Sequence, residues 1–205
     1  TTGTELTLHG PYGEQQVRLN VPGLYNAYNA LAATAGAHAM SASWEAVEQG
    51  YKAFTAAFGR FERVRVGERE IVLTLVKNPV GCNEVLRMLS SEPTSEPILL
   101  IINDKTADGR DVSWLWDADF EMLASLPGPL ITSGLRAADM GVRLKYAGIP
   151  QERIHVIEPV SAALERAVSL TSPAGTLRVM PTYTAMLELR AHMGELGWVE
   201  PYWEE

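Results

Sequence analysis

Cysteine, histidine and positive charge are all scarce in this sequence. Its 205 residues include one cysteine, Cys82, and four histidines, and 25 acidic residues outnumber 17 basic ones, which gives a net charge of −8. A single thiol excludes an internal disulfide framework and an all-cysteine zinc site, and it fits a reducing, cytoplasmic compartment. The acidic balance argues against a nucleic-acid surface, which requires a basic face. We expect Cys82 to be a small apolar core residue, and we predict no metal site, because no two histidines stand at ligand spacing.

Long apolar runs and phosphate-binding loops are also missing. No apolar run reaches about 18 residues and no signal peptide is visible, so the sequence predicts no membrane-spanning helix. Neither the Walker A pattern G-x-x-x-x-G-K-S/T nor a G-x-G-x-x-G after a strand occurs, so the chain on its own has neither standard phosphate-cradling loop. The chain also opens without an initiator methionine, and we expect it to begin inside a domain of a longer protein.

Strand and helix patterns follow one another along the whole chain. The first residues predict a hairpin over 4–10 and 14–21 that turns at Gly10–Gly13, and then two helices over 25–40 and 41–54, the second starting at a serine. Further on, short apolar runs alternate with helical patterns. They predict strands at 71–76, 98–102, 129–133, 153–157 and 176–180, and helices at 80–90, within 117–126, and at 137–147, 161–171 and 183–196.

This alternation is typical of an α/β fold. It predicts a Rossmann-like, mostly parallel sheet with helices on both faces. The best domain boundary lies near Phe58-Gly59-Arg60, so that residues 1–57 form the tail of one domain and 58–205 form the Rossmann-like domain. In such sheets ligands bind beyond the carboxyl ends of the strands. We therefore look for functional residues in the segments that follow the strands.

The most unusual segment is 103–121, NDKTADGRDVSWLWDADFE, which directly follows the apolar run PILLII. It contains five aspartates, one glutamate and two tryptophans. A surface loop has no need of the tryptophans, and burying the carboxylates in a core is costly. The mixture indicates a surface that contacts another molecule. Two alternatives are an acidic loop held by two core tryptophans and a metal loop, but the spacing does not match an EF-hand.

Three segments read in order resemble the Mur ligases. GLYNAYNALAA (23–33), FGRFERV (58–64) and LVKNPVGCNEVL (75–86) are similar to the joint between the central ATPase domain and the C-terminal domain of those enzymes. The acidic segment, together with SGLRAADMGVRLKYAGI (133–149) and PTYTAMLELR (181–190), resembles more narrowly the MurT family of ligase-like subunits of lipid II isoglutaminyl synthase. The resemblance covers essentially the whole chain. It implies that residues 1–57 end a Mur ligase central domain and that 58–205 form a MurT-type C-terminal domain.

The resemblance also implies an activity and its partners. ATP with Mg²⁺ would drive amidation of the α-carboxyl of D-glutamate in the lipid II stem, a step of cytoplasmic peptidoglycan synthesis. Ammonia would come from a GatD-type glutaminase in a heterodimer, and the lipid substrate would bring the protein close to the membrane surface. The ATPase P-loop and the zinc-ribbon cysteines of the family would lie upstream of residue 1.

Five residues match nucleotide-binding positions of the resemblance. Asn26 and Asn29 match the two asparagines of the family's helix start, where Asn29 would meet adenine, because an amide can both donate and accept hydrogen bonds. Arg60 would reach the phosphates of ATP with its planar charged fork, and Lys77 and Asn78 would lie near the nucleotide or the acyl phosphate. The alternatives are helix N-capping by Asn26, a solvated linker charge at Arg60, and a snorkelling structural lysine at Lys77.

The acidic segment supplies the candidate catalytic residues. A Cys–His pair works best when a third, anionic group fixes the imidazole, and the resemblance implies that this chain lends the glutaminase such an aspartate. Asp117, directly after the WLW sequence, is the first choice, and Asp111 is the second. Trp114 and Trp116 would anchor the partner interface. Of the other aspartates, Asp108 fits a turn before Gly109 and Asp119 fits a helix cap.

Two other functions fit parts of the sequence. One is a stand-alone amino-acid-adding Mur ligase or a folylpolyglutamate synthase relative, which would need no glutaminase and would leave the WLWD sequence without a purpose. The other is a non-catalytic module that docks to a glutaminase and activates it. Glutaminase activity measured with and without this chain separates the first of these from the second.

Overall fold

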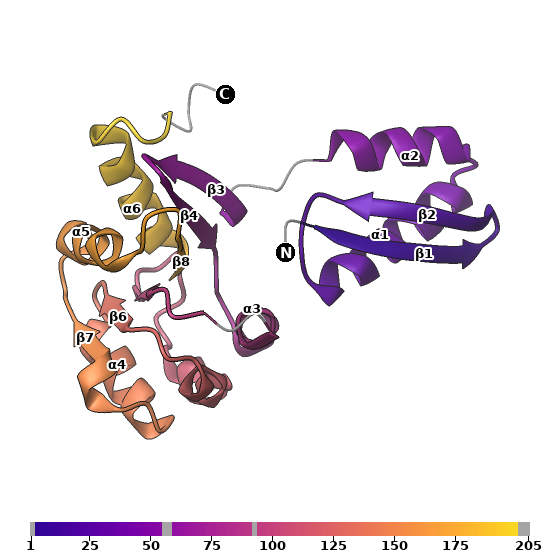
Figure 1. Ribbon diagram of the computed structural model, residues 1–205. Coiled ribbons are helices and arrows are strands. Elements are labelled where there is room, and N and C mark those ends of the chain that lie inside the picture. The colour runs from indigo at the N-terminus through magenta and orange to yellow at the C-terminus, as the bar shows by residue number, and fades with distance from the viewer. Residues whose placement is uncertain (1–2, 55–58, 92–93, 201–205) are drawn as a thin grey trace. The chain divides into compact units, whose positions relative to one another are not determined.

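The chain divides into two compact units, residues 1–61 and 62–205. The structure is a computed structural model and describes residues 3–54, 59–91 and 94–200 (Figure 1). The boundary expected after residue 57 falls on residues 55–58, which lie outside the described part. Each unit is described by itself.

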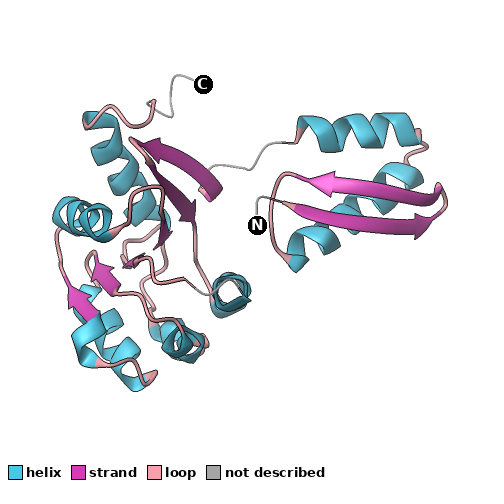
Figure 2. Ribbon diagram, viewed as in Figure 1, coloured by secondary structure: helices cyan, strands magenta, loops and turns pink. Residues whose placement is uncertain are grey.

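The first unit is a two-stranded hairpin packed with two helices (Figure 2). Strands β1 (Thr4–Gly10) and β2 (Gly13–Leu19) pair antiparallel, with Gly10 opposite Gly13, as predicted. Helices α1 (Leu24–Ala39) and α2 (Trp44–Ala53) follow. The expected serine start is Ser43, whose hydroxyl accepts a hydrogen bond from the backbone N–H of Ala46 at 3.3 Å.

The second unit is built on a six-stranded sheet in the order β3-β4-β8-β5-β6-β7. The pairs β4–β8, β8–β5, β5–β6 and β6–β7 are parallel, and β3 and β4 are neighbours joined by residues 67–68 alone, which is a hairpin connection. The mostly parallel Rossmann-like sheet is therefore confirmed. The strands are β3 (Arg60–Val66), β4 (Arg69–Thr74), β5 (Ile98–Ile101), β6 (Leu130–Ser133), β7 (Ile154–Val156) and β8 (Thr176–Pro181).

Helices cover both faces of this sheet, as the unbroken apolar strands predicted. Side chains alternate along β5, so that Leu100 joins one core cluster and Leu99 joins the other. The Leu100 face packs against α3 (Pro79–Ser91) and α4 (Ala137–Tyr146). The Leu99 face packs against α5 (Val160–Leu170) and α6 (Tyr183–Glu195).

The helix expected within 117–126 is instead a short 3₁₀ helix, η2 (Phe120–Ser125), and another 3₁₀ helix, η1 (Ser113–Trp116), precedes it. The buried side chains explain the difference. Leu115 and Ala118 are three residues apart, as are Phe120 and Leu123. A spacing of three matches the three residues per turn of a 3₁₀ helix, so the segment turns its apolar side to the core in two short pieces.

Gly134, between β6 and α4, tests the close packing at the carboxyl edge of the sheet. It has φ +84°, and a Cβ there would lie 2.7 Å from Asn103 Oδ1 and 2.8 Å from the Ile102 carbonyl oxygen. We expect Gly134→Ala to lower the free energy of unfolding by about 3 kcal/mol, through left-handed strain plus overpacking. Urea unfolding followed by tryptophan fluorescence measures the change.

Gly148 provides the matched control, because its φ is +80° and a Cβ there meets nothing within 4 Å. Gly148→Ala should cost about 1 kcal/mol, from the left-handed conformation alone. Equal costs at the two glycines would contradict the close approach described at Gly134.

Candidate functional site

A buried polar network joins the carboxyl ends of three neighbouring strands. Asn103, directly after β5, is 1% exposed. Its backbone N–H donates to Thr182 Oγ1 at 3.0 Å and its Nδ2 donates to Thr184 Oγ1 at 3.2 Å, both beyond β8. Its Oδ1 accepts from the Leu135 N–H at 2.9 Å, beyond β6. Asn103 thus fixes the start of the acidic segment to the sheet.

Asp108 ties the middle of the same loop to helix α6. Its carboxylate accepts hydrogen bonds from the Thr184 N–H at 2.7 Å, from Thr184 Oγ1 at 2.5 Å and from the Lys105 N–H at 3.1 Å. The bond to Lys105 belongs to the turn that the sequence predicted at Asp108. The bonds to Thr184 were not predicted, because the partner is 76 residues away and no local pattern marks it.

Arg136 lies between two carboxylates at the start of α4. It contacts Asp104 at 2.6 Å and Asp139 at 3.3 Å. The hydrogen bond and charge of Asp104, with a smaller contribution from Asp139, raise the pKa of Arg136. Together these three side chains carry a net charge of −1, so the Arg136 guanidinium itself is already paired and is not left for an anionic ligand.

The candidate carboxylates Asp111 and Asp117 are both exposed but differ in their bonding. Asp111 Oδ1 accepts from the Ser113 N–H at 2.8 Å, and hydrogen bonds from the Ser113 hydroxyl and backbone lower its pKa. The Asp117 backbone N–H donates to the Trp114 carbonyl at 3.1 Å, while its carboxylate has no hydrogen-bond or ion-pair partner among the residues that the structure describes. Asp117 is therefore the acid left available for an external group.

The two tryptophans of the acidic segment have different surroundings. Trp114 is half-buried and packs against the core cluster beneath the segment. Trp116 is 55% exposed, and its ring meets that of Tyr146 edge-on at 5.7 Å between centroids. Tyr146 and Val142, both on α4, are also exposed. The part of this surface that a partner can reach is thus Trp116 with α4, while Trp114 mainly joins the segment to the core.

The acidic segment is held in place by Asn83 and Arg143, two residues that the sequence did not single out. Asp119 begins η2, but its side chain makes no capping bond, so that prediction is wrong. Its carboxylate instead accepts from Asn83 Nδ2 at 2.9 Å, and its N–H donates to Asn83 Oδ1 at 2.8 Å.

Arg143, buried in α4, donates to Glu121 at 2.9 Å, and this bond lowers the pKa of Glu121. An arginine on the apolar stripe formed by Met140 and Leu144 was the available sequence signal.

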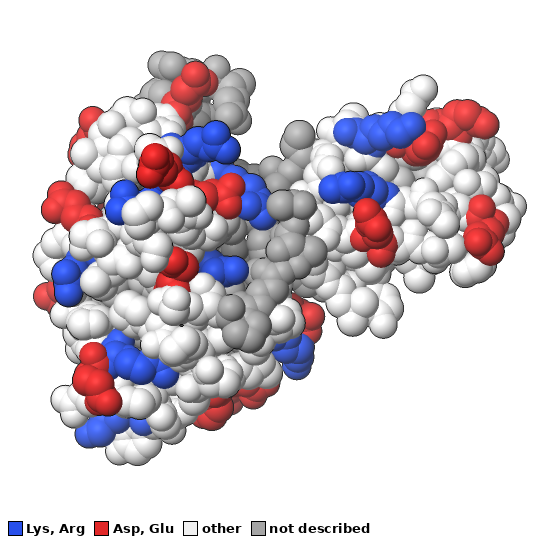
Figure 3. Space-filling view, in the orientation of Figure 1, with Lys and Arg blue, Asp and Glu red and all other residues white. Residues whose placement is uncertain are grey.

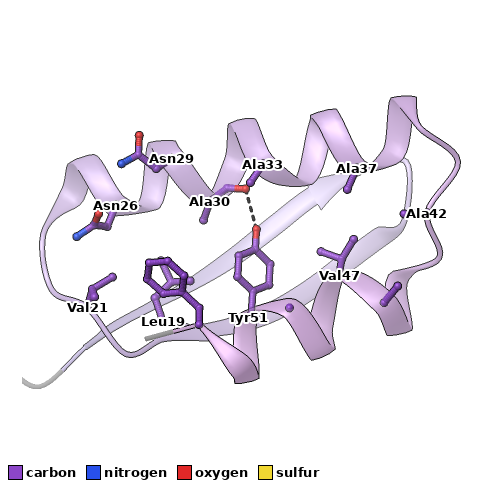
Figure 4. A pocket seen from close by; sticks show the side chains of 13 residues that line it. Leu19, Val21, Asn26, Asn29, Ala30, Ala33, Ala37, Ala42, Val47 and Tyr51 are labelled. Carbon is purple, nitrogen blue, oxygen red and sulfur yellow. Dashed lines mark hydrogen bonds between the residues drawn. The ribbon is translucent and has the colours of Figure 1, made fainter. Parts of the chain in front are cut away.

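The first unit has an apolar cavity of about 540 Å³ between α1, α2 and β2. Asn26 and Asn29 are among its lining residues, and Tyr51 donates a hydrogen bond to the Ala30 carbonyl across it (Figure 4). Helix α1 is capped at Gly23 without a side-chain bond, so helix N-capping by Asn26 is excluded. The Asn26 Nδ2 instead donates to the Pro22 carbonyl at 2.7 Å. Asn29 is exposed, and its amide points away from Tyr51.

The three remaining nucleotide candidates follow the linker and strand β4. Asn78 Oδ1 accepts from the Gly81 N–H at 2.8 Å and so caps helix α3. Lys77 is exposed and forms no ion pair within the described part of the chain. The side chain of Arg60 lies outside the description. Asn26 and Asn29 belong to a different unit from Lys77 and Asn78, and we treat the two pairs separately.

Charge and metal-ligand patterns add little to these sites. On the face shown in Figure 3, basic and acidic side chains are interspersed rather than gathered into patches of one sign. Within residues 3–54, 59–91 and 94–200, no three His, Cys, Asp or Glu side chains are grouped to hold a metal ion. No helix in these same ranges has the length and apolarity needed to cross a bilayer.

The family model described as MurT ligase C-terminal matches residues 75–186. The MurT subunit of lipid II isoglutaminyl synthase (glutamine-hydrolyzing) from Streptococcus pneumoniae strain R6 is 36% identical over 177 residues, 86% of this chain and 39% of the relative. The MurT subunit from Staphylococcus aureus strain COL is 32% identical over 137 residues, 66% of this chain and 31% of the relative. The chain thus spans well under half the length of the curated relatives it matches.

Solved structures of similar fold come from the wider ligase group. MurF from Acinetobacter baumannii matches with a TM-score of 0.69 and 20% identity, over 95% of this chain and 42% of that protein. Folylpolyglutamate synthase from Mycobacterium tuberculosis, complexed with ADP and AMPPCP, matches with a TM-score of 0.71 and 19% identity, over 98% of this chain and 46% of that protein. At these identities the likeness is one of fold.

Cys82 offers a direct test of the core beneath the acidic segment. It is fully buried in α3, and burial raises the pKa of its thiol to about 12. Because the thiolate is the reactive form, we expect almost no reaction with a disulfide reagent such as Ellman's reagent at pH 8 in the native protein. One thiol per chain should react after addition of guanidinium chloride, and stoichiometric reaction of the native protein within minutes would contradict the described core.

Proposed function

This chain belongs to the MurT ligase C-terminal family, and from that premise we propose that it is part of the ligase subunit of a glutamine-dependent lipid II isoglutaminyl synthase. In this proposal the subunit amidates the α-carboxyl of D-glutamate in the lipid II stem during peptidoglycan synthesis. Ammonia comes from a GatD-type glutaminase with which the subunit forms a heterodimer. The reaction takes place in the cytoplasm, at the membrane surface where the lipid substrate resides.

The proposed amidation has two steps. The γ-phosphoryl group of ATP passes to an oxygen of the substrate carboxylate, and ADP leaves. Ammonia then attacks the carbonyl carbon of the acyl phosphate, phosphate leaves, and a proton is released to give the amide. Positioning and neutralisation of phosphate charge dominate the first step. Mg²⁺ bound with the nucleotide would supply part of the neutralising positive charge. In this proposal the P-loop is supplied from outside these 205 residues, because they contain no Walker A pattern.

The described residues differ in how well they suit the nucleotide. Asn29 suits a purine edge, because its exposed amide can donate and accept. Lys77 suits a phosphate or acyl phosphate oxygen, because its ammonium has no ion-pair partner among the described residues. Asn26 and Asn78 each use one polar atom in a local bond and keep the other for a ligand. Arg60 is the proposed linker cation.

The activation of the partner rests on one observation, the unbonded exposed carboxylate of Asp117. Asp104, Asp108, Asp111 and Asp119 each accept a hydrogen bond or join an ion pair within the chain, whereas the Asp117 carboxylate has no such partner in the part of the chain that is described. An aspartate offered to the imidazole of a Cys–His pair fixes its tautomer and stabilises its cation. Delivery across an interface keeps the glutaminase idle until the ligase subunit is present.

The surface beside Asp117 suits a protein partner. Trp116 and Tyr146 are large exposed aromatics in contact with each other, and such residues commonly form the energetic centre of an interface. Trp114 is half-buried and packs against the core cluster, so it joins the acidic segment to the core. Asp117 follows Trp116 in the chain, and Glu121 is bonded to Arg143, whose guanidinium lies by the Trp116 ring. Both carboxylates are exposed, which favours a partner with basic groups around an apolar centre.

Substitution of Asp117 tests the proposed function. When the chain is mixed with a GatD-type glutaminase, Asp117→Asn should lower the glutaminase kcat by at least about 100-fold, because the imidazole loses its anionic partner. The matched control Asp111→Asn should change kcat less than about threefold, since that carboxylate is already bonded to Ser113. Glutamate release from glutamine is the measurement.

Four further results decide between the alternatives. Amidation driven by added ammonium, in a polypeptide that joins this chain to a Mur ligase ATPase portion, should be unaffected by Asp117→Asn. Full glutaminase activity without the chain would favour a stand-alone amino-acid-adding ligase. Activation of the glutaminase without any ATP-dependent amidation would favour a docking module alone. Loss of activity with Asp111→Asn in place of Asp117→Asn would overturn the choice of aspartate.

The interface has a separate test in binding affinity. Trp116→Ala should weaken the complex with the glutaminase by about 30-fold, the change expected for a central aromatic anchor. Tyr28, which is also exposed but lies on α1 of the first unit, provides the control, and Tyr28→Ala should leave the dissociation constant unchanged. Calorimetric titration measures both, and an unchanged affinity for Trp116→Ala would remove this surface from the interface.

A further inference from the structure

Arg143 is a buried cation whose hydrogen bonds converge on the backbone around Asp117. It lies in α4 with 4% of its surface exposed. Its Nε donates to the Leu115 carbonyl at 2.9 Å, and its Nη2 donates to the Ala118 carbonyl at 2.7 Å. Resting on the proposed function, we propose that Arg143 is a positioning residue that fixes the direction in which Asp117 presents its carboxylate.

The chemistry of the guanidinium suits this role. A buried charge is tolerated only when its donors are bonded, and these donors end on two backbone carbonyls, one on each side of Asp117, as well as on Glu121. The guanidinium is planar and rigid, so it fixes the two carbonyls relative to each other. The backbone of Asp117 between them therefore has little freedom to rotate.

The same guanidinium also lies against the neighbouring aromatic rings. Its Cζ is 5.6 Å from the centre of the Trp116 ring and 5.5 Å from that of Phe120, distances at which a cation attracts an aromatic face. Phe120 is 1% exposed and belongs to the core, whereas Trp116 is largely exposed. Arg143 thus connects the core to the residue that immediately precedes Asp117.

A second clamp acts on the C-terminal side of Asp117 and comes from a different helix. Asn83 in α3 makes the reciprocal pair of bonds with Asp119, one to its carboxylate and one from its N–H. Helices α3 and α4 both pack on the same face of the sheet. The segment from 115 to 119 is therefore held at both ends by polar side chains from a rigid layer.

This arrangement orients Asp117 without bonding its carboxylate. The bonds from Arg143 and Asn83 end on the backbone of Leu115 and Ala118, on the side chain of Glu121, and on the backbone and side chain of Asp119. A backbone that is held in place limits the positions open to a carboxylate whose lone pairs are free, and this helps to preorganise it for an external donor. Asp111, in contrast, uses a carboxylate oxygen in its own turn. The structure thus assigns the positioning to Arg143, assisted by Asn83, and the contact with the partner to Asp117.

The test is a double-mutant cycle on glutaminase kcat in the complex of the chain with a GatD-type glutaminase. Arg143→Met should lower kcat by about 10- to 100-fold, the loss expected for a displacement of about 1 Å, with little change in the KM for glutamine. In the Asp117→Asn background, Arg143→Met should cause no further loss, because its effect passes through Asp117. A merely structural role would instead give losses that multiply.

Arg153→Met is the matched control. Arg153 also donates to backbone carbonyls, at Gly128 and Leu123 near the end of η2, but away from Asp117. We expect it to lower the melting temperature and to leave kcat within about threefold of the wild type. A loss of kcat equal to that of Arg143→Met would overturn the inference, because any loosening of the segment would then suffice.

Two milder variants test the proposal if Arg143→Met does not fold. Arg143→Lys retains the charge but not the fork, and Asn83→Ala removes only the second clamp. Each should lower kcat by about 3- to 10-fold and be non-additive with Asp117→Asn. Losses that multiply, or unchanged kcat in both variants, would overturn the positioning role. An unchanged kcat for Asp117→Asn alone would instead overturn the proposed function.

Discussion

The bonds from the Arg143 guanidinium to the carbonyls of Leu115 and Ala118 connect the interior of the fold to its candidate functional surface. The Leu115 carbonyl belongs to the short 3₁₀ helix η1 and the Ala118 carbonyl to the link between η1 and η2, where the backbone is not held by an α-helical ladder. A loop with this composition would otherwise be expected to move. Because a buried charge strongly resists losing its bonds, the segment acquires the rigidity of the helix layer beneath it.

The sheet supplies the other half of the same design. Its parallel strands end at one edge, and Asn103 gathers the ends of β5, β6 and β8 through three hydrogen bonds. Asp108 then ties the following loop to the start of α6. The acidic segment therefore leaves the sheet from a fixed point and returns to a fixed point at Arg143. An exposed aspartate and an exposed tryptophan are presented between two anchored ends, which suits a contact with another protein more than a flexible loop would.

The sequence predicted the sheet well because its strands carry unambiguous physical signals. The run Ile98–Ile101 is fully apolar, as a strand buried on both faces must be, and the glycine-rich turn at Gly10–Gly13 leaves few alternatives to a hairpin. The acidic segment was recognised from its composition, but not its 3₁₀ geometry, which depends on packing against α3 and α4. Likewise, the partners of Asn103, Asp108 and Asp119 are 32 to 81 residues away, beyond the reach of local patterns. Arg143 could have been found from its position on an apolar helical stripe.

A solved structure of this chain in complex with a GatD-type glutaminase would show whether Asp117 reaches the histidine of the glutaminase. The measurement is the distance from the Asp117 carboxylate to the nearer ring nitrogen of the glutaminase histidine that pairs with its cysteine. We predict a hydrogen bond of about 2.6 to 3.2 Å between the Asp117 carboxylate and that nitrogen. Trp116 should be buried at the contact, and Arg143 should still be bonded to the carbonyls of Leu115 and Ala118. An Asp117 that faces solvent, with the glutaminase bound on another surface, would contradict the account.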